Sequence, residues 1–109
     1  MEIIFHAHHA TISSRLQQRA EQGVRKLVQR LGRAVDAVVR FEADGPTRRV
    51  EVILHAPRSR RLVARSEGRY FGPALTVALH RLEAQVLRSR RPRKGTVSRR
   101  ESAARLASA

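Results

Sequence analysis

Residues 35–66 read VDAVVRFEADGPTRRVEVILHAPRSRRLVARS, and this stretch decides the fold. Apolar and polar residues alternate over residues 35–43 and again over residues 48–56, which is typical of strands with one buried face. Residues 62–66 form a third, shorter run of the same kind. Turn sequences containing Gly or Pro separate the runs. Because these connections are of hairpin length, we expect the three strands to form an antiparallel meander.

The flanking sequence predicts one further strand and two helices. Residues 3–8 are strand-like, and apolar residues then recur at helical spacing up to Leu31, with Ser13 as the expected N-cap and Gly32 just after the helix. A second helix is expected after Gly68, which we interpret as a turn glycine with positive φ, with Gly72 as its cap and Pro73 in its first turn.

This order of elements predicts an α+β domain with the arrangement β-α-β-β-β-α. Both helices are amphipathic, so we expect both to pack on one face of a four-stranded sheet and to leave the other face open to water. We assign residues 1–91 to this single domain. Residues 92–109 are basic and poor in large apolar side chains, and we expect them to form a disordered tail.

The composition points to a polyanionic partner. The chain of 109 residues has 23 Lys and Arg against 9 Asp and Glu, a formal charge of +14. A compact domain with this charge commonly has nucleic acid as its counterion. No cysteine is present, which excludes disulfides and zinc sites built from cysteine. No apolar run is long enough to span a membrane, so we expect a cytoplasmic protein.

The helices carry much of the charge that acids do not compensate. On a helical wheel, the basic residues of the first helix lie away from its apolar face, and the second helix and the tail continue the basic surface. A solvated helix face is the ordinary alternative, but ordinary surfaces intersperse both signs, so we favour binding to the phosphate backbone. Since exposed aromatic residues are few, recognition should depend on shape and backbone rather than on stacked bases. The candidate RNA-binding residues are Arg15, Arg19, Arg25, Lys26, Arg30, Arg33, Arg81, Arg88, Arg90, Arg91, Arg93 and Lys94.

Other residue types offer weaker candidates. His6, His8 and His9 suggest a metal site, but no carboxylate or cysteine lies near them in sequence, and ordinary histidines at a strand end are the preferred interpretation. His55 and His80 stand alone. The acids are scattered among arginines, where we expect ion pairs, and no catalytic set can be assembled. We therefore expect neither enzymatic activity nor a cofactor or metal.

Four short stretches resemble a known family. They are residues 12–16 (ISSRL) at the start of the first helix, Lys26-Leu27, the strand over residues 35–42, and residues 64–68 (ARSEG) before the second helix. None is a signature alone. Together with the spacing, length and charge, they resemble the bacterial ribosome hibernation-promoting factors, also described as ribosome-associated inhibitors or sigma-54 modulation proteins.

The resemblance implies a fold similar to the double-stranded-RNA-binding domain with an added first strand. It also implies binding to the small subunit and the 70S ribosome through 16S rRNA, in the decoding channel, where mRNA and tRNA sites are covered and translation is blocked. No membrane or small-molecule partner is implied, and a monomer is expected off the ribosome. The alternative is a general structured-RNA-binding or ribosome-assembly protein that leaves the decoding site open. Basic family positions match at Lys26, Arg33, Arg81, Arg88 and Arg90.

The chain departs from the family pattern around its second helix and once in its first. Tyr70 and Thr76 occupy positions where the family usually has aspartate, and Gly72 stands in the place of a tyrosine. Gly23 replaces a family lysine. We therefore expect a divergent, short member of the family whose second helix restarts at Gly72-Pro73.

Overall fold

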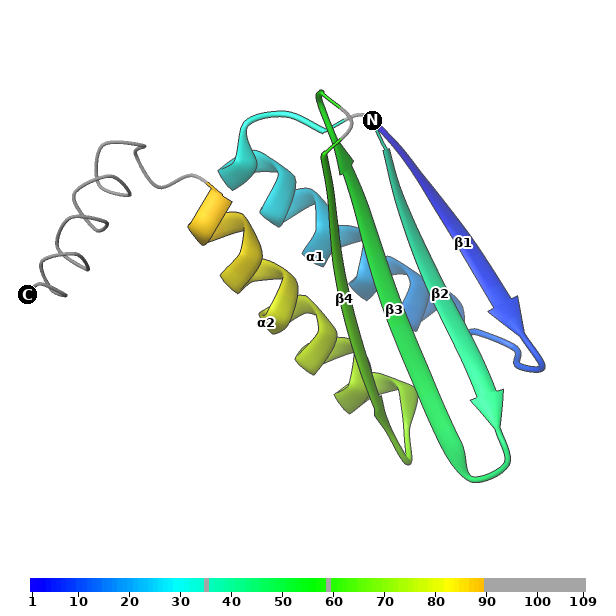
Figure 1. Cartoon of the computed structure of the whole chain (residues 1–109). Helices are drawn as coiled ribbons and strands as arrows, with labels where there is room; N and C mark the ends of the chain where they lie inside the picture. Colours follow the sequence, from blue (N-terminus) through cyan, green and yellow to red (C-terminus); the bar gives the residue numbers. More distant parts are fainter. Residues whose placement is uncertain (35, 59, 90–109) are drawn as a thin grey trace, which may run out of the picture.

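The computed structural model describes residues 1–34, 36–58 and 60–89, which form a sheet covered on one face by two helices (Figure 1). The predicted β-α-β-β-β-α order is confirmed. The elements are β1 (Glu2–His8), α1 (Ser14–Leu31), β2 (Asp36–Asp44), β3 (Thr47–Ala56), β4 (Arg60–Gly68) and α2 (Phe71–Ser89). The tail assigned to residues 92–109 lies outside the described residues.

The sheet has the strand order β1-β2-β3-β4. The predicted meander is present, with β2, β3 and β4 in antiparallel register. The β2–β3 hairpin turns through Gly45, whose φ of 61° is a left-handed conformation that glycine adopts without a steric penalty. The chain returns through α1 between β1 and β2, and this crossover makes the two strands parallel. β1 is consequently an edge strand at the side opposite β4 (Figure 1).

The core is aliphatic and lies between the helices and the sheet. Alternate residues of β2 and β3 supply Val39, Phe41, Val52 and Leu54, and all four side chains are buried. The helices cover them with buried residues at helical spacing, namely Ala20, Val24 and Leu27 from α1 and Ala74, Leu75, Ala78, Leu82 and Val86 from α2. Burial of this apolar surface is the main force that holds the two layers together.

The two helices run in the same direction, side by side. Arg19 in α1 contacts the first turn of α2, whereas Arg30 near the end of α1 contacts Glu83 further along α2. Between these contacts the helices approach closely, because a Cβ atom at Gly23 would lie 2.6 Å from Leu79 Cδ1. Gly23 therefore faces α2, and the absence of a side chain there allows the close approach.

Both ends of α1 lie where the sequence predicted them, whereas the predicted start of α2 was wrong. The Ser13 hydroxyl accepts a hydrogen bond from the Leu16 backbone N–H at 3.1 Å, and Gly32 after the helix has a φ of 95°. α2, however, begins at Phe71 and not at Gly72-Pro73: the Ala74 N–H already donates to the Tyr70 carbonyl at 3.3 Å. Proline at the third helical position is compatible with this start, since N–H groups of the first turn need no partner within the helix.

The prediction for Gly68 was also wrong. Gly68 does not adopt positive φ; it is the last residue of β4 and pairs with Arg48 of β3. β4 is longer than predicted at both ends because its pairing with β3 continues from Arg60 to Gly68. The turn into α2 is made by the two residues that follow.

Candidate nucleic-acid interface

The two faces of the molecule differ in how their charges are paired. The sheet surface away from the helices, called here the open face, carries side chains in rows that cross the strands. One row joins His6, Arg40, Glu51 and Arg65, and the next joins His8, Glu42, Arg49 and Glu67. From β2 to β4, acids and bases alternate along both rows, so opposite charges meet directly across these neighbouring strands.

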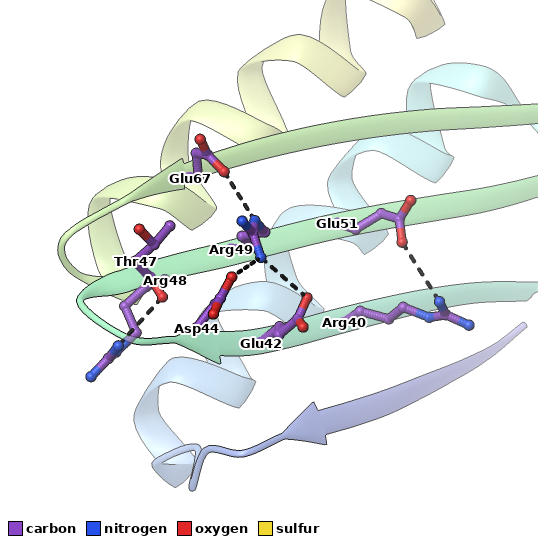
Figure 2. A network of polar contacts seen from close by, with 8 residues as sticks. All are labelled: Arg40, Glu42, Asp44, Thr47, Arg48, Arg49, Glu51 and Glu67. Carbon is purple, nitrogen blue, oxygen red and sulfur yellow. Dashed lines mark hydrogen bonds and ion pairs between the residues drawn. The ribbon is translucent and has the colours of Figure 1, made fainter.

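Arg49 is the centre of the largest charge cluster on the open face (Figure 2). Its guanidinium lies 3.0 Å from carboxylate oxygens of both Asp44 and Glu67 and 3.8 Å from Glu42. Hydrogen bonds to Glu67 and then to Asp44 raise the pKa of Arg49 above its ordinary value. One cation thus links three strands and offsets part of the negative charge of three acids from β2 and β4.

Two further acids of the open face are also paired. Glu51 accepts a hydrogen bond from Arg65 Nε at 2.9 Å and lies 3.8 Å from Arg40 Nη1. Asp36 pairs with the imidazole of His55. The expectation that acids sit among arginines as ion-pair partners is confirmed for these residues, and the carboxylates of the open face outnumber the arginines that contact them.

The opposite surface is strongly basic. We use the name helix face for the eight exposed basic residues that lie on α1, just after its C-terminal end, and on α2. The same two helices carry two acids, Glu21 and Glu83. Glu21 pairs with Arg25 at 3.0 Å, and Glu83 pairs with Arg30. The residues of the helix face are Arg15, Arg19, Arg25, Lys26, Arg30, Arg33, Arg81 and Arg88.

Four of these cations have no partner within the described part of the chain. Arg15, Lys26, Arg33 and Arg88 make neither a hydrogen bond nor an ion pair with any described residue. A guanidinium or ammonium group that faces only water can bind a phosphate oxygen without first breaking an internal contact.

The predicted residue Arg81 has a structural partner that the sequence did not reveal, and its neighbour Gln85 makes a similar contact. Arg81 donates to the backbone carbonyl of Arg65 at 2.6 Å, and Gln85 donates to that of Val63, also at 2.6 Å. These contacts satisfy carbonyl groups at the unpaired edge of β4, which would otherwise be open to another strand. Arg81 is therefore bound to the edge of the sheet in addition to being exposed on α2.

Arg19 joins the two helices. Its guanidinium donates to the carbonyl of Gly72 at 3.4 Å and to the hydroxyl of Thr76. Thr76 stands where the resemblance implies an aspartate, so this arginine bonds neutral oxygen atoms and keeps its charge uncompensated. The remaining predicted residues, Arg90, Arg91, Arg93 and Lys94, lie outside the described residues.

The weaker candidates gain no support from the geometry. His6 and His8 share the open face as expected, beside a shallow hollow that also contacts Arg40 and Glu51. Within residues 1–34, 36–58 and 60–89, no three potential metal ligands come together. No helix in that same portion is long and apolar enough to cross a membrane.

Two solved structures resemble this chain in fold. A ribosomal subunit interface protein from Coxiella burnetii matches with a TM-score of 0.75 and 17% identity, over 82% of this chain and 97% of that one. The N-terminal domain of Protein Y from Thermus thermophilus matches with a TM-score of 0.72 and 23% identity, over 83% and 100% of the two chains. At this level of identity the likeness establishes the fold alone, which is the one predicted.

Sequence comparison assigns the family. No curated protein sequence matches the chain significantly. The family model described as "Sigma 54 modulation protein / S30EA ribosomal protein" matches residues 3–94, which is most of the chain and includes all of the described elements except the first residue of β1. The chain therefore belongs to the sigma 54 modulation protein / S30EA ribosomal protein family, a family of ribosome-associated proteins.

Proposed function

We propose that this protein is a translation inhibitor and hibernation factor that binds rRNA of the small ribosomal subunit through its helix face. In this proposal it occupies the decoding channel, covers the sites of mRNA and tRNA, and acts in the cytoplasm as a monomer without a cofactor. Residues 1–91 form the ribosome-binding domain, and the basic tail over residues 92–109 adds to the binding.

The unequal pairing of charge on the two faces is the observation that supports this proposal most directly. On the open face, arginines form ion pairs with Glu42, Asp44, Glu51 and Glu67. Arg15, Lys26, Arg33 and Arg88 have no partner among the described residues. A surface of unpaired cations on rigid helices suits the phosphate backbone of a folded RNA. Family membership then favours ribosomal RNA over other polyanions.

In this proposal the protein inhibits translation simply by occupying the decoding channel. Bound cations release the counterions condensed on the rRNA, which supplies the affinity. A rigid domain held in the channel excludes mRNA and tRNA sterically, so the protein needs no catalytic group.

The test compares two double variants that remove equal charge from opposite faces. Lys26→Gln with Arg88→Gln removes two unpaired cations from the helix face, and Arg40→Gln with Arg65→Gln removes two paired cations from the open face. We expect the first to weaken co-sedimentation with purified small subunits about tenfold and the second to change it much less. Circular dichroism checks that both variants are folded.

Equal losses from both double variants would refute the assignment of the helix face. Cell-free translation separates the proposal from its alternative: the wild-type protein should inhibit protein synthesis at concentrations that saturate the ribosome. A protein that binds free rRNA or assembly precursors and leaves translation unchanged would instead be a general RNA-binding or assembly protein. A version that ends at residue 91 measures what the tail contributes.

A further inference from the structure

One aromatic side chain of the described residues is left in water. Tyr70, in the turn between β4 and α2, is 68% exposed, more than any other large hydrophobic residue in the described ranges. The other three aromatic residues, Phe5, Phe41 and Phe71, are buried or partly buried. Tyr70 also stands where the family pattern has an aspartate, so its ring is a feature of this chain.

The next residue holds this turn in place. Phe71 turns inward, where its ring meets that of Phe41 edge to face at 5.4 Å between centroids. The guanidinium of Arg48 lies 5.8 Å from the Phe71 centroid, on the same ring. The Tyr70 carbonyl accepts the first hydrogen bond of α2 from Ala74. The backbone of Tyr70 is therefore anchored where α2 begins, while its side chain makes no hydrogen bond with any described residue.

Basic residues of two elements contact the neighbours of Tyr70, and a third basic residue precedes it in the turn. Arg48 of β3 reaches Phe71, Arg19 of α1 reaches Gly72, and Arg69 directly precedes the tyrosine. The nearest acid in sequence, Glu67, is engaged by Arg49 at 3.0 Å. An exposed ring on a fixed backbone, next to cations that suit phosphate groups, has the chemistry of a stacking site for a nucleobase.

We propose that Tyr70 stacks on one unpaired base of the bound rRNA and fixes the register of the helix face on it. This inference rests on the proposed function and deepens it. It assigns one stacking contact at the end of a surface that otherwise contacts the backbone, and not a platform for successive bases. The ring supplies apolar contact with the base, while Arg69, Arg48 and Arg19 provide positive charge for the adjoining phosphates.

The amino-acid composition allows stacking at Tyr70 to be followed directly by tyrosine fluorescence. Tyr70 is the sole tyrosine and there is no tryptophan, so tyrosine emission from this protein reports on position 70 alone. Protein-free small-subunit rRNA adds no tyrosine. We expect this rRNA to quench the emission on binding, and a blunt RNA duplex, which offers no unpaired base, to bind without comparable quenching.

Affinity for purified small subunits gives the second readout. Tyr70→Phe keeps the ring and should bind like the wild type, whereas Tyr70→Ala should bind about tenfold more weakly because one stacked base is lost. Leu87→Ala, which removes a half-exposed apolar side chain from α2, serves as the matched control and should have little effect. Circular dichroism confirms that each variant is folded.

The outcomes separate this inference from the proposed function. Wild-type affinity of Tyr70→Ala for subunits, or full rRNA binding without quenching, would overturn the stacking contact and leave the helix-face assignment intact. Equal weakening in Tyr70→Phe and Tyr70→Ala would also overturn it, because the hydroxyl and not the ring would then be the binding group. Loss of binding in the Lys26 and Arg88 variant tests the helix face independently of Tyr70.

Discussion

At the scale of the residue, the neighbours of a basic side chain decide what it can do. Arg49 and Lys26 carry the same charge, yet Arg49 is held by three carboxylates and Lys26 faces solvent with no partner in the described chain. Exposed ion pairs stabilise a fold only slightly, so the main effect of the Arg49 cluster is to surround this cation with carboxylates and leave it no charge for a phosphate. Lys26 keeps its charge for an external partner.

The cap of α1 can be tested at the same scale. Ser13→Ala removes the hydroxyl that accepts from the Leu16 N–H, and we expect the free energy of unfolding to fall by about 1 kcal/mol in urea denaturation. Ser14→Ala is the matched control, since Ser14 is the first residue of the helix and its hydroxyl makes no described hydrogen bond. Equal effects at both positions would mean that Ser13 does not act as the cap.

The roles of individual residues were predicted correctly from the sequence where their conformation depends on neighbours within the same turn. Ser13 as N-cap and Gly32 after the helix follow from hydrogen bonds and φ angles within one turn. Gly68 was mispredicted because its conformation depends on pairing with Arg48, a residue of another strand. The bond from Arg81 to the carbonyl of Arg65 was missed for the same reason: it depends on how α2 lies against β4.

At the scale of the element, one glycine sets the distance between the helices. Gly23→Leu would drive its side chain into Leu79, and we expect it to cost about 2 kcal/mol of unfolding free energy, as overpacking typically does. Gln22→Leu, at an exposed position of the same helix, is the control. In a Leu79→Ala background the cost of Gly23→Leu should shrink; an unchanged cost would show that Leu79 is not what it meets.

Element order and type were predictable, whereas some boundaries and one pairing were not. Strong alternation predicted β2 and β3, and helical spacing predicted α1. The start of α2 was placed too late because Gly72-Pro73 resembles a helix start, while packing of Phe71 on Phe41 draws the preceding turn into the helix. The parallel pairing of β1 with β2 results from the crossover through α1. It depends on tertiary structure, and no local sequence pattern indicates it.

At the scale of the whole molecule, the salt dependence of binding counts the phosphate contacts. The logarithm of affinity for small subunits should fall linearly with the logarithm of salt concentration. Lys26→Gln with Arg88→Gln should reduce the slope by about 2, one for each contact, and Arg40→Gln with Arg65→Gln should leave it unchanged. Binding titrations at several salt concentrations check both values, and identical slopes for the two variants would contradict the helix face.

The partition of charge between the two faces also affects the approach to a partner. With carboxylates paired on the open face and unpaired cations on the helix face, the charge distribution has a dipole directed from the sheet to the helices. The field of a large polyanion exerts a torque on such a dipole and turns the helices toward the anion while the molecules are still separated by solvent. Orientation before contact reduces the number of unproductive collisions, so in the proposed function the unequal charge of the two faces would also speed association with the ribosome.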